Sequence, residues 1–225
     1  MDAVTYALAA QIIPLLRDQK HWFSRANMPT GRYYLAAAPL SGDRVLAVGG
    51  YTGTSVLSAV QRYDDATNTW TARANMPTGR SYLAAASLSG DRVLAVGGYS
   101  GSGTLSTVER YDDATNTWTA RANMPTGRDG LAAAPLSGDR VLAVGGYSGG
   151  ALNTVERYDD ATNTWTARAN MPTGRYGLAA APLSGDRVLA VGGIGGVNTV
   201  ERYDDIDHDI LRLLRTIQSW AATRP

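Results

Sequence analysis

The chain repeats one unit at a nearly fixed interval, and this repetition constrains its fold more than any other feature. The nineteen residues "RYDDATNTWTARANMPTGR" run from Arg62 to Arg80 and recur from Arg110 to Arg128 and from Arg157 to Arg175. Glycine pairs recur at steps of 48, 48 and 47 residues, and four tryptophans keep the same steps: Trp22, Trp70, Trp118 and Trp165. A fixed period of this length predicts stacked structural repeats, each packing on its neighbours.

Each unit contains four short apolar stretches separated by turn sequences. In the first unit they are "YYLAAAPL" from Tyr33, "RVLAVGG" from Arg44, "SAVQRYD" from Ser58 and "TWTA" from Thr69. The intervening "SGDR" and "DATN" carry residue types that favour turns. Four strands in each repeat predict the blade of a β-propeller.

The order of glycine, tyrosine and tryptophan in each unit resembles the kelch repeat. Gly50, Tyr63 and Trp70 are followed by "MPTGR", and the resemblance covers Trp22 to Asp205. It implies an all-β fold, a kelch-type β-propeller with four four-stranded blades per chain. It also implies that the glycines let a neighbouring aromatic side chain approach the backbone, and that Tyr and Trp pack between adjacent sheets. The residues given these structural roles are Trp22, Gly49, Gly50, Tyr63, Trp70, Gly97, Gly98, Tyr111, Trp118, Gly145, Gly146, Tyr158, Trp165, Gly192, Gly193 and Tyr203.

Three regions are predicted along the chain. Residues 1–20 and 206–225 carry apolar side chains at helical spacing, which predicts an N-terminal and a C-terminal helix flanking a propeller at 21–205. "HWFSRANMPTGR" from His21 matches "TWTARANMPTGR" from Thr69, while the fourth unit loses the pattern after Asp205. Residues 21–29 are therefore expected to form a clasp strand that completes the last blade. Trp220 is a second candidate for that strand, although no "NMPTGR" follows it.

The clasp allows two modes of ring closure. Either a monomer closes its own four blades, or two chains exchange clasp strands and form an eight-bladed homodimer. Both modes remove exposed sheet edges. The alanines of "LAAA" in each innermost strand suit a crowded centre and favour the monomer.

The sequence offers little for catalysis. The chain has no cysteine, and His21 and His208 are its only histidines, so no Ser-His-Asp grouping forms inside a blade. The "DHD" around His208 fits a solvated helix start better than a metal site, because adjacent helical residues point in different directions. We therefore expect no enzyme activity, no catalytic residue, no metal site and no cofactor.

Charge and hydropathy bear on partners and location. The formal net charge is +1, which provides no field to gather nucleic acid or an acidic membrane. No apolar run approaches the length of about 20 residues that a membrane-spanning helix needs. The N-terminal stretch carries Asp2 and no early Lys or Arg, which argues against a signal peptide. We expect a cytoplasmic protein without nucleic-acid or membrane partners.

Charged residues that recur in every unit are expected to serve the scaffold. Paired aspartates, at 64–65, 112–113, 159–160 and 204–205, are expected to cap a turn instead of binding calcium or acting as acid and base. Two sets of arginines are expected to link blades, with Asp43, Asp91, Asp139 and Asp186 as candidate partners. The alternative for these arginines is an anion-binding ring. The two sets are Arg32, Arg80, Arg128 and Arg175, and Arg62, Arg110, Arg157 and Arg202.

The copies differ almost entirely in two places, directly after "PTGR" and directly after the glycine pair. In kelch proteins these places surround the mouth of the central channel and commonly bind peptides or proteins. The resemblance thus implies a set of partner-binding residues: Tyr33, Tyr34, Tyr51, Ser81, Tyr82, Tyr99, Asp129, Tyr147, Tyr176 and Ile194. Gly130 and Gly177 stand where the first two units have Tyr34 and Tyr82. The face lacks the arginines that some kelch proteins use for acidic peptides.

Two functional interpretations remain. The first is a non-enzymatic kelch propeller that serves as a protein- or peptide-binding or scaffold module through these loops. A face rich in Tyr, Ser, Thr and Gly suits adaptable recognition. The second is a recently amplified or consensus-designed structural propeller with no specific ligand, because the copies are nearly identical and exposed loops tolerate drift.

Overall fold

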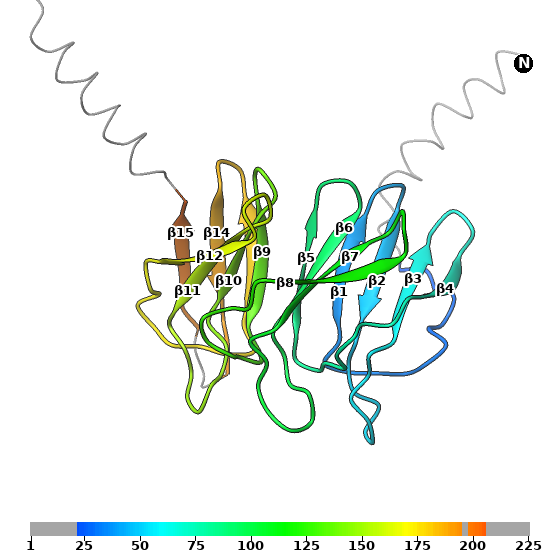
Figure 1. Ribbon diagram of the computed structural model, residues 1–225, viewed down its shortest axis with the longest axis horizontal. Helices are drawn as coiled ribbons and strands as arrows, with labels where there is room; N and C mark the ends of the chain where they lie inside the picture. Colours follow the sequence, from blue (N-terminus) through cyan, green and yellow to red (C-terminus); the bar gives the residue numbers. More distant parts are fainter. Residues whose placement is uncertain (1–21, 195–197, 206–225) are drawn as a thin grey trace, which may run out of the picture.

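The chain folds into four antiparallel β-sheets arranged as the blades of a β-propeller (Figure 1). The computed structural model describes residues 22–194 and 198–205. Three sheets have four strands, and the sheet nearest the C-terminus has three. The strands of each sheet follow one another in chain order, so each blade is a simple meander. The predicted all-β propeller is confirmed, whereas the helices predicted at 1–20 and 206–225 lie outside the described residues.

Corresponding strands have the same sequence position in every unit. Blade 1 consists of β1 (Ala36–Leu40), β2 (Arg44–Val48), β3 (Val60–Asp64) and β4 (Thr69–Arg73). Blade 2 consists of β5 (Ala84–Leu88), β6 (Arg92–Val96), β7 (Val108–Asp112) and β8 (Thr117–Arg121). Blade 3 consists of β9 (Ala132–Leu136), β10 (Arg140–Val144), β11 (Val155–Asp159) and β12 (Thr164–Arg168). Blade 4 consists of β13 (Ala179–Leu183), β14 (Arg187–Val191) and β15 (Val200–Asp204).

Two turns in each full blade use residues that tolerate a positive φ. Asp43, between β1 and β2, has φ 54°, and Asn68, between β3 and β4, has φ 53°. Asp and Asn enter this left-handed region more readily than other residues with a side chain. In the second of these turns of blade 2, Asp112 Oδ1 accepts hydrogen bonds from the backbone N–H groups of Ala114 and Thr115. The predicted turn capping is therefore confirmed for the first aspartate of the pair.

The hydrophobic core lies between blades. We call the face of a blade that packs on the following blade its forward face, and the opposite face its rear face. Ala38, Leu46 and Val60 on the forward face of blade 1 pack on Val93 and Tyr111 on the rear face of blade 2. Equivalent clusters join blades 2 and 3 and blades 3 and 4. Each blade thus depends on its neighbours to bury its apolar surface.

The four blades form an arc with two free ends. The innermost strands β1, β5, β9 and β13 pack on one another in that order, and β13 has no comparable packing on β1. In Figure 1, blade 1 lies at the right of the view, and β14 and β15 of blade 4 lie at the left. Val200 on the forward face of blade 4 is 56% exposed, whereas the equivalent Val60 is 1% exposed. Within the described residues, a single chain does not close the four-bladed ring that was expected from its alanine-rich innermost strands.

The predicted clasp is not formed within the described chain. Residues 22–29 contain no strand, Trp22 is fully exposed, and the fourth sheet lacks an outer strand. Instead, the Ala26 N–H donates to Asn68 Oδ1 at 2.8 Å, and Trp70 Nε1 donates to the Ala26 carbonyl at 2.9 Å. These bonds hold the segment on blade 1, at the opposite end of the arc from β15. Within the described residues, the segment therefore makes no contact that completes blade 4 of its own chain, and the clasp at 21–29 stays a prediction.

Candidate functional site

The two variable segments of each unit are hydrogen-bonded to each other. Tyr33 and Tyr51 form an isolated antiparallel bridge, with their backbone N–H groups and carbonyls paired at 3.1 and 2.8 Å. The same bridge joins Ser81 to Tyr99 and Asp129 to Tyr147. In the fourth unit, the Ile194 N–H donates to the Tyr176 carbonyl at 2.8 Å. The variable positions therefore lie together in every blade, although the paired residues are 18 positions apart in the sequence.

These segments line two adjoining hollows. One, of about 670 Å³, lies over blades 1 and 2 and is lined by Tyr33, Tyr34, Tyr51, Thr54, Ser55, Val56, Ser81, Tyr82, Tyr99, Ser100 and Gly101. The other, of about 690 Å³, extends over blades 3 and 4 and is lined by Tyr34, Tyr82, Tyr99, Asp129, Gly130, Tyr147, Tyr176, Gly177 and Ile194. Tyr34, Tyr82 and Tyr99 belong to both. All ten predicted binding residues are therefore brought together at one surface, and their binding role stays a prediction.

Tyrosine rings form much of this surface. Tyr34 and Tyr82 stack with their ring centroids 3.7 Å apart and an interplanar angle of 22°. Tyr33 meets Tyr34 and Tyr51 edge to face, with centroids 4.6 and 5.5 Å apart. Tyr34 and Tyr82 are 46% and 39% exposed. The rings are thus held by one another and still present aromatic surface to solvent, as recognition sites do.

The backbone of the two stacked tyrosines is in an unfavourable conformation. Tyr34 has φ 57° and Tyr82 has φ 53°, in the left-handed region where a bulky side chain costs about 1–2 kcal/mol. At the equivalent positions, Gly130 with φ 56° and Gly177 with φ 60° carry no such cost. The same backbone conformation is therefore adopted by a strained tyrosine in two units and by a relaxed glycine in the other two.

The electrostatics of the surface are simple. Asp129 is the only charged residue among those that line the two hollows. Burial raises the pKa of the Asp129 carboxyl above its ordinary value. Burial, together with a hydrogen bond and proximity to Tyr34, raises the pKa of Tyr82 to about 12, so its hydroxyl remains protonated and able to donate near neutral pH. The site thus presents neutral hydroxyls and one carboxylate, without a cation.

The repeated glycines and arginines form the support beneath this surface. A Cβ on Gly49 would lie 2.4 Å from the Arg80 carbonyl oxygen, so the close neighbour is backbone and not the aromatic side chain that the resemblance implied. Arg80 itself is fully buried. Its N–H donates to the Leu57 carbonyl of blade 1, while its guanidinium donates to the Gly97 and Thr107 carbonyls of blade 2. This confirms the predicted blade-to-blade role of this arginine set.

In blades 2 and 3, tyrosine and tryptophan pack between sheets as the resemblance implied, whereas Trp22, which was given the same role, is fully exposed. Tyr111 and Trp118 lie with ring centroids 5.1 Å apart and pack against the core shared by blades 1 and 2. The Trp118 Nε1 donates to the Ala74 carbonyl of the preceding linker at 2.8 Å. Tyr158 and Trp165 repeat the arrangement in blade 3.

A second layer of ion pairs was only partly predicted. The buried Asp113 accepts hydrogen bonds from Arg44 and Arg62 of blade 1 at 2.8 and 2.7 Å. The second aspartate of the pair thus links blades in blades 2, 3 and 4 and does not cap a turn there. Asp91 pairs with Arg44, which was not among the predicted arginines. An arginine equivalent to Arg44 follows the aspartate of "SGDR" in every unit. This repetition is the sequence feature that could have indicated its role in ion pairs.

Within residues 22–194 and 198–205, no group of three or more His, Asp or Glu side chains is arranged to hold a metal ion. In the same part of the chain, no helix is long and apolar enough to cross a membrane.

Fold and surface together define a kelch-type β-propeller with a tyrosine-rich hollow at its channel mouth. The sequence matches the family model described as the KLHDC2/KLHL20/DRC7 Kelch-repeats domain over residues 17–193, so the chain belongs to the kelch-repeat family. Kelch-repeat propellers are generally non-enzymatic protein-interaction modules. No curated protein matches the chain.

Proposed function

We propose that the chain is a non-enzymatic interaction module that binds an extended protein segment in the hollows at the channel mouth. The observation that carries the proposal is the pair of strained, stacked tyrosines, Tyr34 and Tyr82. The fold accepts glycine at their positions in the third and fourth units, so the aromatic side chains are not needed for folding. Membership of a family of protein-interaction modules supports the same conclusion.

The lining favours a segment with a positively charged side chain. Arginine and lysine bind over aromatic faces within about 6 Å of the ring centroid, and Asp129 supplies the only countercharge. An acidic segment would find no cation among the lining residues. We infer a partner segment that carries Arg or Lys beside aromatic or small polar residues.

Peptide display with the intact chain tests this function. Peptides selected by the wild-type chain are expected to be enriched in Arg or Lys. Replacing both tyrosines, as Tyr34→Gly with Tyr82→Gly, is expected to weaken binding at least about tenfold, as loss of aromatic hot spots does. The same variant should unfold at equal or higher urea concentration, because the backbone strain is relieved.

Two controls separate binding from folding. Thr119→Ala changes an exposed side chain on the outer strand β8, which lines neither hollow, and should leave binding unchanged. Asp129→Asn should reduce the preference for basic peptides. If the double glycine variant binds the selected peptides as tightly as the wild type, or if the wild type selects no peptide, the structural-propeller interpretation replaces this one.

A further inference from the structure

The forward face of blade 4 exposes apolar side chains whose equivalents in the other blades are buried or partly buried. Val200 is 56% exposed, whereas its equivalent Val155 in blade 3 is 2% exposed. Leu183 and Val191 of the same face are 39% and 40% exposed. These side chains project from three adjacent strands, so they form one apolar face. Such a contiguous face marks an interaction site.

The rear face of blade 1, at the other end of the arc, is also incompletely covered. Val45 and Tyr63 there are partly exposed, whereas the equivalent Val93 and Tyr111 of blade 2 are completely buried beneath blade 1. The two ends of the arc therefore present the two faces that make each internal interface. A forward face and a rear face of this chemistry pack together three times within the molecule.

The charges at an internal interface follow a fixed pattern. Arg44 of blade 1 pairs with Asp91 and Asp113 of blade 2 at 2.6 and 2.8 Å, and Arg62 pairs with the same Asp113 at 2.7 Å. The pattern recurs between blades 2 and 3 and between blades 3 and 4. Forward faces thus supply arginines, and rear faces supply aspartates.

At the ends of the arc, the arginines and the aspartates of this pattern are present without each other. Arg187 and Arg202 of blade 4 occupy the positions of Arg44 and Arg62, but in the described residues they reach only Ser184 and Asp204 of their own blade. Asp43 and Asp65 of blade 1 occupy the positions of Asp91 and Asp113. Within the described ranges, Asp43 has no ion pair, and the only ion pair of Asp65 is with the exposed Arg25 at 3.3 Å. The two ends are therefore complementary in charge.

The backbone at the channel mouth shows the same incompleteness. Tyr82 donates its N–H to the Tyr34 carbonyl, Gly130 to Tyr82, and Gly177 to Gly130, at 2.7–2.9 Å. This ladder crosses all four blades in one direction. Among the described backbone groups, the Tyr34 N–H at one end of the ladder donates no hydrogen bond of this kind. The Gly177 carbonyl at the other end accepts none. One more bond of the same kind would join the two ends of adjacent molecules.

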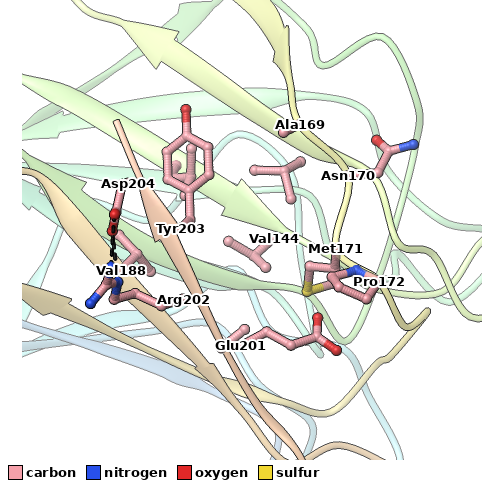
Figure 2. A pocket seen from close by; sticks show the side chains of 13 residues that line it. Val144, Ala169, Asn170, Met171, Pro172, Val188, Glu201, Arg202, Tyr203 and Asp204 are labelled. Carbon is pink, nitrogen blue, oxygen red and sulfur yellow. Dashed lines mark hydrogen bonds and ion pairs between the residues drawn. The ribbon is translucent and has the colours of Figure 1, made fainter. Parts of the chain in front are cut away.

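Blade 4 also contains a pocket where the other blades hold a tryptophan. In blade 3, the Trp165 Nε1 donates to the Ala122 carbonyl, and the indole packs beside Tyr158. The equivalents in blade 4, Ala169 and Tyr203, line a pocket of about 220 Å³ between blades 3 and 4. Figure 2 shows the Tyr203 ring on one side of this pocket and Pro172 on the other. No described tryptophan occupies it.

The repeat pattern identifies Trp22 as the missing tryptophan, and its attachment shows where it belongs. Ala26 is bound to Asn68 and Trp70 of blade 1 in the way that Ala74 is bound to Asn116 and Trp118 of blade 2. The residues before Ala74 form β4, the outer strand of the blade that covers the rear face of blade 2. By the same geometry, residues 22–25 belong to a blade that covers the rear face of blade 1.

We propose that this blade is blade 4 of a second copy of the chain. Its forward face docks on the rear face of blade 1, Arg187 and Arg202 pair with the partner's Asp43 and the partner's Asp65, and the partner's Trp22 fills the pocket beside Tyr203. Exchange of the clasp in the reverse direction forms a second, identical interface. Propellers typically have four to eight blades, so two copies complete a ring of eight, whereas three would exceed that range. This inference is independent of what the channel mouth binds.

Solution mass with a face variant tests the docking. Light scattering at micromolar concentration is expected to give twice the chain mass of 23.8 kDa for the wild type. Val200→Lys places a charge on the exposed forward face and should give the single-chain mass with an unchanged β-sheet circular dichroism spectrum. The control Thr119→Lys, at an exposed position on the outer strand β8, should remain a dimer. A wild-type mass of one chain, or a dimeric Val200→Lys chain, overturns the proposal.

An engineered disulfide distinguishes exchange between chains from closure within one chain. Gln61 and Ala72 are cross-strand partners in blade 1, and Glu201 and Ser24 are their equivalents. Because the chain has no cysteine, Ser24→Cys with Glu201→Cys introduces one defined pair. Gln61 shows that a neutral residue is accepted at the glutamate position. Oxidation is expected to yield a covalent dimer on non-reducing electrophoresis, and the single variants should stay unlinked. A disulfide within one chain, or no disulfide, overturns the exchange.

Discussion

At the residue scale, identical residues in identical sequence surroundings have different environments. Asp65 and Asp113 each follow "RYD" and precede "ATNTW". The Asp113 side chain is 5% exposed and pairs with Arg44, Arg62 and Arg73, whereas Asp65 is 45% exposed and pairs only with Arg25 among the described residues. The difference arises because blade 2 has a preceding blade in the chain and blade 1 has none. Position in the arc, and not local sequence, determines the energetic role of these carboxylates.

This contrast predicts unequal effects of one substitution. Asp113→Asn leaves Arg62 and Arg73 without a countercharge and removes one of the two partners of Arg44. It should lower the free energy of unfolding by about 3 kcal/mol, as breaking a buried ion pair does. Asp65→Asn, the matched control, should cost less than about 1 kcal/mol, as expected for an exposed pair. Urea denaturation in the monomeric Val200→Lys background measures both. Equal losses would show that the two sites are energetically equivalent and would contradict the open arc.

At the element scale, hairpins of adjacent blades are joined by an aspartate in a turn. Asp91, between β5 and β6, accepts hydrogen bonds from the Ser41 side chain and backbone N–H and pairs with Arg44 of blade 1. These hydrogen bonds, reinforced by Arg44, lower the pKa of Asp91. The pKa values of Asp139 and Asp186 are also lowered, because their serine and arginine partners outweigh the opposing effect of burial.

The lowered pKa values predict a loss of stability in acid. A carboxyl group whose pKa is lower in the folded state contributes its full stabilisation of the fold above its unfolded pKa of 3.8. This stabilisation is lost as the pH falls through the pKa of the folded state. The free energy of unfolding should therefore decrease as the pH is lowered below about 4. Replacing the three aspartates by asparagine should lower stability at neutral pH and flatten this acid dependence. Asp43→Asn is the control in the Val200→Lys background, and a slope unchanged by the triple replacement would contradict the assignment.

The strands were predictable from sequence because their signals are local. "YYLAAAPL", "RVLAVGG", "SAVQRYD" and "TWTA" each contain one strand, and "SGDR" and "DATN" form the turns between strands. The pairing of Arg44 with Asp113 was not predictable, since 69 residues separate the two and every unit offers equivalent partners. The repeat also identified the outer-strand sequence around Trp22 without indicating which sheet accepts it. For the channel mouth, the positions were predictable from their variation, but the stacking of Tyr34 on Tyr82 required coordinates.

At the scale of the whole molecule, the same interface joins successive blades three times. Its two complementary faces are left unpaired at the two ends of the arc. The same apolar faces, arginine–aspartate pairs and backbone ladder join successive blades. A chain of such repeats gains stability from each neighbour contact, so open ends have a cost that closure removes. The near identity of the units makes the ends complementary without any specialised residue. Closure by a second copy therefore follows from the repetition itself.

A crystal structure of the wild-type chain tests this central claim most directly, because it counts the blades around the channel and locates Trp22. We expect eight blades from two chains, with the Trp22 indole Nε1 donating to the Ala169 carbonyl of the other chain. A four-bladed ring closed within one chain, with Trp22 in its own chain's pocket, would contradict it.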